Sequence, residues 1–150
     1  MNNLVLSDVG VDLIVEFEGL RLNPYPDSRG FATVGIGHLI RNGPVLSTDL
    51  PITKPEAYDI FRKDSSVAQW AVNAYVTASI TQNQFDALVC FVFNIGSGNF
   101  RLSSVLTTVN ESQFASVPQH LALYNESGGK VLPGLIRRRA AESALFMKGV

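Results

Sequence analysis

Two carboxylic acids and one hydroxyl group lie within sixteen positions of one another near the start of the chain. They are Glu18, Asp27 and Thr33, and the run Val-Gly-Ile-Gly-His follows Thr33 directly. Cleavage of a glycosidic bond needs two carboxyl groups in different surroundings, because one must be protonated as an acid and the other ionised as a base or nucleophile. The residue types and their spacing therefore predict an enzyme that cleaves glycans.

The element that positions Glu18 is predicted to be a helix over about residues 8–18. Apolar residues recur there at helical spacing, capping side chains precede them, and Gly19 follows where a helix commonly stops. Glu18 is thus expected beside a buried stripe, where partial removal from water favours the protonated form that a general acid needs. Glu16 points to a different face and is the poorer candidate.

Asp27 and Thr33 are expected on a turn and on a strand. Two prolines exclude helix before Asp27, and Asp27–Gly30 has the composition of a type I turn. Period-two alternation then predicts one strand over residues 31–38, with two glycines on the Thr33 face where a bulky ligand could approach the backbone. His38 is expected on the opposite face, as a structural partner. Taken singly, each of these features also has an ordinary structural interpretation.

Three motifs in order together resemble the phage-type lysozymes, which are the bacteriophage endolysins and belong to the glycoside hydrolases. The first is the Glu18–Thr33 segment already described. The second is Thr81–Leu88, which leads into Phe93–Gly96, and the third is Gly128–Leu135, followed by three arginines and Glu142. The resemblance spans nearly the whole chain.

The resemblance implies an α+β, lysozyme-like fold. We expect a small N-terminal β-sheet region and a mostly helical C-terminal lobe, joined by a long helix that opens at a capping box at Thr53, with the active-site cleft between the lobes. With 150 residues, of which 46% are hydrophobic, the chain can bury a core as a single catalytic domain, residues 1–150, in two lobes.

The resemblance also implies an activity, the hydrolysis of the beta-1,4 bond between N-acetylmuramic acid and N-acetylglucosamine in bacterial peptidoglycan, which causes host cell lysis. Glu18 is expected to be the general acid, Asp27 the base or electrostatic stabiliser, and Thr33 the residue that positions the attacking water. A water between Asp27 and the sugar would invert the anomeric centre, and this is the outcome that we expect. Matching family positions suggest four substrate-binding residues, namely Leu39, Phe93, Ser103 and Asn125.

Basic residues are concentrated at the end of the chain, although the net charge is −1. The stretch from Ser127 carries five basic residues and one acidic residue, Glu142, and three of the basic ones are Arg137–Arg139. This stretch is either a cationic surface for an anionic wall polymer or an ordinary solvated helix face. At most one or two of the arginines are expected to face the cleft, where one could pair with Glu18.

Other chemistries and partners are not supported by the sequence. Two histidines, His38 and His120, are too few for a metal cluster, no dinucleotide loop is present, and no basic and aromatic patch for nucleic acid is visible. We therefore expect no metal, no cofactor and no nucleic acid. The one cysteine, Cys90, lies in an apolar run and is expected to be buried and inert.

The expected compartment and partners follow from the resemblance and from the residues of the N-terminal segment. We expect no signal peptide, because acidic residues interrupt the first apolar stretch, and no stable membrane insertion, because the longest apolar run is too short to span a bilayer. We expect a monomer that stays in the host bacterial cytoplasm until a phage holin releases it, and that then acts on periplasmic peptidoglycan.

Two other functions stay open. A lytic transglycosylase also uses a catalytic glutamate but needs no ionised partner or water-holding hydroxyl, so Asp27 and Thr33 favour hydrolysis. A non-catalytic module that binds peptidoglycan or belongs to the virion could keep the same fold, because fold alone does not define function.

Overall fold

The computed structural model describes residues 2–150, which form two compact units. Ile14–Ser66 contain a small antiparallel sheet and are called the sheet unit below. The N-terminal residues up to Leu13, together with Val67–Val150, are built mainly from helices and are called the helical unit. The predicted α+β combination of a small N-terminal sheet with a mostly helical C-terminal part is confirmed.

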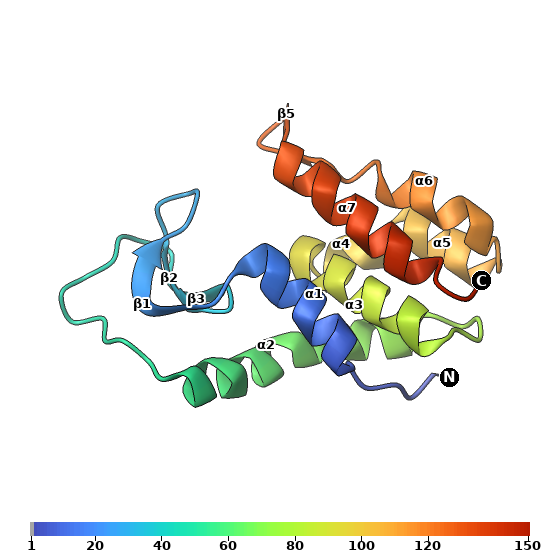
Figure 1. Ribbon diagram of the computed structural model, residues 1–150. Helices are drawn as coiled ribbons and strands as arrows, with labels where there is room; N and C mark the ends of the chain where they lie inside the picture. Colours follow the sequence, from blue (N-terminus) through green and yellow to red (C-terminus); the bar gives the residue numbers. More distant parts are fainter. Residues whose placement is uncertain (1) are drawn as a thin grey trace. The chain divides into compact units, whose positions relative to one another are not determined.

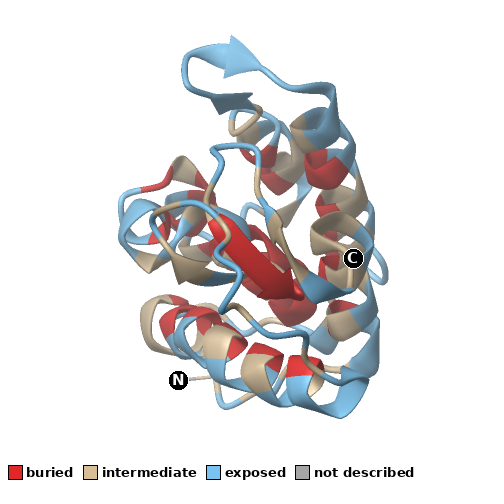
Figure 2. Ribbon diagram, turned by 90° about the vertical axis from the view of Figure 1, so that its left-hand side faces the viewer, coloured by how far each residue is buried: buried red, intermediate tan, exposed pale blue. Residues whose placement is uncertain are grey.

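The sheet unit carries a three-stranded antiparallel sheet in the order β1-β2-β3. The strands are β1 (Arg21–Pro26), β2 (Ala32–Gly35) and β3 (His38–Arg41) (Figure 1). The central strand β2 is buried along its whole length, as its red ribbon in Figure 2 shows. A central strand covered on both faces holds its residues in one fixed position, and Thr33 is one of them.

The predicted single strand over residues 31–38 is wrong. The chain turns back at Gly35 and Gly37, which have φ values of 65° and 66°, and β3 begins at His38. These glycines are needed because side chains are strained at such backbone angles. Gly35 faces the protein rather than a ligand, since a Cβ there would lie 3.3 Å from the side chain of Ile52 and 3.5 Å from Ala57.

His38 does lie on the sheet face opposite Thr33. In the antiparallel register Thr33 pairs with Leu39 and Val34 pairs with His38, so His38 shares the face of Val34. Its Nδ1 atom is 2.8 Å from Oδ2 of Asp64 on α2. This contact links the start of β3 to the helix and gives His38 the structural partner expected of it.

The loop after β3 is closed by an ion pair between Arg41 and Asp49. The guanidinium donates two hydrogen bonds to the carboxylate, one of them of 2.6 Å from Nη1, and the amide of Leu46 donates another of 2.8 Å. These bonds, the one from Arg41 first, lower the pKa of Asp49 from 3.8 to about 2. The carboxylate therefore stabilises the folded chain while it is ionised.

We predict that Asp49→Asn lowers the free energy of unfolding at neutral pH and that the loss disappears in acid. A lowered folded-state pKa gives stability that is present above the unfolded pKa of about 3.9 and is lost as the pH falls towards about 2. Urea unfolding of both proteins across this range should therefore give curves that converge as the pH falls. A gap of constant size would contradict the assignment.

A long helix, α2 (Lys54–Tyr75), follows this loop. Its start is the predicted capping box, in which the Thr53 amide donates to the Glu56 carboxylate over 2.7 Å and the Glu56 amide donates back to the Thr53 hydroxyl over 3.4 Å. The residues of α2 up to Ser66 belong to the sheet unit, and those from Val67 belong to the helical unit. The predicted long connecting helix is thus present.

The helical unit is built around α3 (Gln82–Ile95), which packs against α7 (Pro133–Phe146) (Figure 1). The pairing of Thr81 with Gln84 in the sequence also predicts a capping box, and this box opens α3. Most of this helix is buried. The remaining elements of the unit are α4 (Ser97–Arg101), α5 (Ser104–Asn110), the short 3₁₀ helix η1 (Phe114–Ser116), α6 (Val117–Leu121), β4 (Glu126–Ser127) and β5 (Lys130–Val131).

Two details of the helical unit differ from expectation. From the sequence, a helix is expected over residues 113–124, with Pro118 disturbing it. The structure instead has η1 followed by α6, with Pro118 in the first turn of α6, where a missing amide costs nothing. The hairpin of β4 and β5 was not predicted at all. Its turn uses Gly128 and Gly129 at positive φ, and the hairpin is exposed in Figure 2.

The interior of the helical unit contains an ionic cluster of Arg138, Arg139 and Glu142. Glu142 is fully buried, and its Oε1 accepts 3.2 Å hydrogen bonds from Nε of Arg138 and from Nη2 of Arg139. The Arg138 Nη2 group also donates to the carbonyl of Cys90, and Arg139 donates to the side chain of Asn94. The idea that the arginine run forms a solvated or cationic surface is therefore wrong for two of its three residues, and only Arg137 is exposed.

Candidate active site

Glu18 is the last residue of α1 (Asp8–Glu18), as predicted. The helix ends because Gly19 adopts a φ of 76°, and its amide still donates to the carbonyl of Val15 over 2.8 Å. A residue at the rigid end of a helix has a fixed Cα position. To hold the carboxyl group in place, the surrounding residues then have to restrict only the side-chain torsions of Glu18.

The Glu18 carboxyl group packs against Gly37 in the turn before β3. A Cβ atom placed on Gly37 would lie only 2.8 Å from Oε2 of Glu18. The glycine thus provides space for the carboxyl group, in addition to allowing the turn. The glycine-rich run was predicted to let a ligand approach, but at Gly37 it is the Glu18 side chain that makes the close approach.

We predict that Gly37→Ala lowers the rate of glycan cleavage at least tenfold. The added methyl group displaces the Glu18 carboxyl group. A shift of about 1 Å in a group that takes part in catalysis can lower the rate by this much. The matched control is Gly129→Ala. Its φ of 75° is similar to the 66° of Gly37 and equally unfavourable for a side chain, but nothing lies within 4 Å of the new Cβ. Equal activity in both variants would show that the space beside Glu18 is unimportant.

Asp27 opens the predicted turn, in which the amide of Gly30 donates to the carbonyl of Asp27 over 2.9 Å. Its Oδ1 accepts hydrogen bonds from the amides of Phe31 and Arg29, over 2.9 Å and 2.8 Å. The Arg29 guanidinium lies 3.2 Å from Oδ2. The bond from Phe31 first, and then those from Arg29, lower the pKa of Asp27 below 3.8. Asp27 is therefore ionised at neutral pH.

Thr33 is nearly buried in the central strand. Its hydroxyl donates to the carbonyl of Phe31 over 3.1 Å, which leaves the lone pairs of the oxygen able to accept a further hydrogen bond. Leu39, the substrate-binding candidate of the sheet unit, is paired with Thr33 across β2 and β3 and is partly exposed.

The first turn of α1 is anchored by Asp86 of α3. Asp86 is fully buried and accepts hydrogen bonds from both the amide and the hydroxyl of Ser7, and from the side chain of Gln82 over 2.8 Å. A carboxylate at a helix N-terminus also interacts favourably with the helix dipole. Gly10 makes this approach possible, because a Cβ there would be 2.9 Å from Asp86. The helix that carries Glu18 is thus fixed at its other end.

The other three predicted substrate-binding residues lie in the helical unit. Phe93 is half-buried near the end of α3. Ser103 is buried, and its hydroxyl caps α5 by accepting from the amide of Leu106 over 3.1 Å. Asn125 lines a cavity of about 230 Å³ together with Arg139, Ala122, Ile136 and Ala140. Ser103 therefore has a structural task in the chain itself.

Sequence reasoning missed two features of the site. One is the close packing of Gly37 on Glu18, which no sequence signal showed. The other is Tyr25, whose pKa is affected by the charges of both Glu18 and Asp27 and which lies on the strand opposite Thr33. Its place in an extended segment two residues before Asp27 was the signal available in the sequence.

No group of three His, Cys, Asp or Glu side chains that could hold a metal ion occurs within residues 2–150. Across the same residues, no helix is both long and apolar enough to cross a membrane.

The fold and the site together define the lysozyme-like class, and comparison with known proteins gives the family. The phage lysozyme family model matches residues 15–142. The endolysin of Bacillus phage PZA is 43% identical over 147 residues, which are 96% of this chain and 55% of that protein. The chain thus spans about half the length of the Bacillus phage endolysins that it matches.

Two solved structures match over nearly their whole length. The muramidase domain of SpmX from Asticaccaulis excentricus is 39% identical, with a TM-score of 0.83 and coverage of 97% of this chain and 99% of that one. The endolysin from Escherichia coli O157:H7 phage FAHEc1 is 31% identical, with a TM-score of 0.89 and coverage of 99% and 97%. The chain belongs to the phage lysozyme family, and the resemblance identified from its motifs is confirmed.

Proposed function

We propose that residues 1–150 form a single catalytic domain that hydrolyses the beta-1,4 bond between N-acetylmuramic acid and N-acetylglucosamine in bacterial peptidoglycan. Glu18 protonates the oxygen of the leaving sugar. Asp27 stabilises the oxocarbenium-like transition state and acts as the base for a water, and Thr33 positions that water. Family membership supports this activity, since relatives are named endolysins and a muramidase domain.

The observation that carries the proposal is the difference between the surroundings of the two carboxyl groups. Asp27 is held ionised by two backbone amides and Arg29. Glu18 ends an amphipathic helix and packs against Gly37. A pair of carboxyl groups with unlike surroundings suits the separate tasks of acid and base.

The accepting capacity of the Thr33 hydroxyl supports hydrolysis through a bound water. A water activated by Asp27 attacks the face of the sugar opposite the leaving group, so the anomeric centre is inverted. Direct attack by Asp27 would retain the configuration and would leave Thr33 without a task.

We further propose that Leu39, Phe93, Ser103 and Asn125 contact the glycan. The protein acts as a monomer. It stays in the host bacterial cytoplasm until a holin releases it to the periplasmic peptidoglycan, and its action lyses the host cell. One arginine of the C-terminal run is proposed to pair with Glu18.

Product analysis of purified peptidoglycan tests the proposed function. Fragments with free reducing muramic acid ends, formed by the native protein and not by Glu18→Gln, are expected. Anhydromuramic acid ends would instead identify a lytic transglycosylase. Binding to the wall without any product would identify a non-catalytic module. The anomer released in the first minutes of the reaction distinguishes inversion from retention.

A further inference from the structure

Tyr25 belongs to a row of side chains that crosses the sheet at Thr33. In the antiparallel register Tyr25 of β1 pairs with Thr33 of β2, and Thr33 pairs with Leu39 of β3. Directly paired residues of antiparallel strands place their side chains on the same face, about 5 Å apart at Cβ. Tyr25 and Leu39 therefore flank Thr33 from both sides, with Tyr25 on the side of Asp27.

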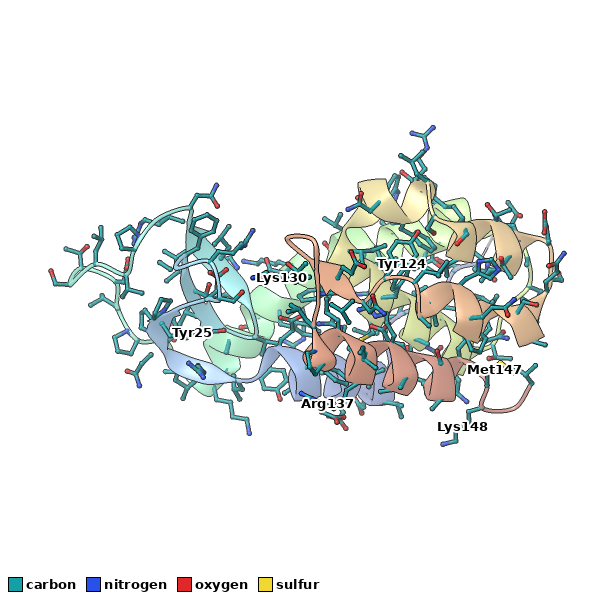
Figure 3. All side chains as sticks on the ribbon, turned by 90° about the horizontal axis from the view of Figure 1, so that it is seen from above. Tyr25, Tyr124, Lys130, Arg137, Met147 and Lys148 are labelled. Carbon is teal, nitrogen blue, oxygen red and sulfur yellow. The ribbon has the colours of Figure 1, made fainter. Side chains whose placement is uncertain are left out.

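The Tyr25 ring is held in place while its hydroxyl group is not used. Arg21 lies four residues earlier on the same strand, and its guanidinium carbon is 4.4 Å from the centroid of the Tyr25 ring, so that a cation–π contact fixes the ring. Tyr25 is labelled among the side chains in Figure 3. Within residues 2–150, the phenol oxygen makes no hydrogen bond to another residue. A fixed ring with an unused donor is the arrangement that a ligand-binding tyrosine requires.

The surroundings of Tyr25 keep its hydroxyl group protonated and able to donate. Partial burial raises the pKa of the phenol above 10, and the negative charges of Glu18 and Asp27 raise it as well, against the opposing effect of Arg21. The phenol is therefore protonated at any pH at which the site operates. It also stands within the field of both carboxyl groups, where the reacting sugar has to bind.

We propose that Tyr25 is a substrate-contact residue whose hydroxyl group donates a hydrogen bond to an oxygen atom of the sugar bound beside Asp27. The identity of the ligand as a glycan rests on the function proposed above. The contact itself follows from the row across the sheet, the ring held by Arg21 and the unused donor.

Tyr25→Phe tests this role because it removes only the oxygen atom. We expect kcat/KM for peptidoglycan fragments to fall about three- to tenfold, the effect of one neutral hydrogen bond, while Tm stays unchanged because no bond within the protein is lost. Tyr58→Phe is the matched control, a half-buried tyrosine of the same unit. A purely structural role would give the reverse result, a lower Tm with an unchanged kcat/KM, and would overturn the proposal.

Binding separates this inference from the proposed function. A soluble tetrasaccharide of N-acetylmuramic acid and N-acetylglucosamine is titrated into two proteins, Glu18→Gln and Glu18→Gln with Tyr25→Phe, and the Kd of each is measured. We expect the Kd to rise by a similar factor when the hydroxyl group is removed, even if the native protein cleaves nothing. Equal Kd values for the two proteins, or no binding by either, would overturn the contact.

Discussion

Glu18→Gln should lower kcat for glycan cleavage by about a thousandfold and leave the fold intact. The amide has the size of the carboxyl group and still fits beside Gly37, but it carries no proton that it can give to the leaving oxygen. General acid catalysis by a placed side chain contributes about 10²- to 10⁴-fold, so the loss should fall in this range. Initial rates on purified peptidoglycan and thermal unfolding measure the two quantities.

Glu16→Gln is the matched control for this experiment. Glu16 lies on the same helix, two residues earlier, and is exposed. It should keep almost the full rate because it points away from the face of Glu18. Similar losses in both variants would mean that the charge of α1 matters and that Glu18 has no specific role as an acid.

The second large effect concerns stability. Glu142→Gln should lower the free energy of unfolding by about 3–5 kcal/mol, because it leaves two buried guanidinium groups without their carboxylate. Burial raises the pKa of Glu142, while Arg139 and Arg138 act in the opposite direction. For a chain of this length, such a loss corresponds to a decrease in Tm of roughly 6–20 °C.

An exposed ion pair provides the comparison. Asp59 and Arg62 also form a contact on one helix, but their side chains are 67% and 72% exposed. Asp59→Asn should therefore change the free energy of unfolding by less than about 1 kcal/mol. If urea unfolding gave the two variants the same small change, the cluster at Glu142 would not stabilise the helical unit.

Local signals in the sequence predicted much of the fold correctly. The capping boxes at Thr53 and Thr81, the end of α1 at Gly19 and the turn at Asp27 are all present. Each depends on residues within a few positions of one another, so a single segment carries all the information. Glu18 and Asp27 are likewise only nine positions apart, so one segment of the sequence contains both.

Features that depend on distant segments were missed or misjudged. The buried state of Arg138 and Arg139 requires Cys90 and Asn94, which lie more than forty residues earlier on α3. A run of arginines looks the same whether or not such partners exist. The turn at Gly35 and Gly37 was misjudged because period-two alternation does not show the positive φ values at which the chain leaves the strand.

The single thiol of the chain provides a direct measure of how often its interior opens. Cys90 is fully buried in α3, and burial raises its pKa, so reagents that attack the thiolate cannot reach it in the folded state. Its modification rate therefore reports the population of molecules in which α3 has separated from its neighbours. Mass spectrometry after timed exposure to a thiol reagent would follow this opening in the unmodified protein, with no label introduced, and would compare every variant named above on one scale.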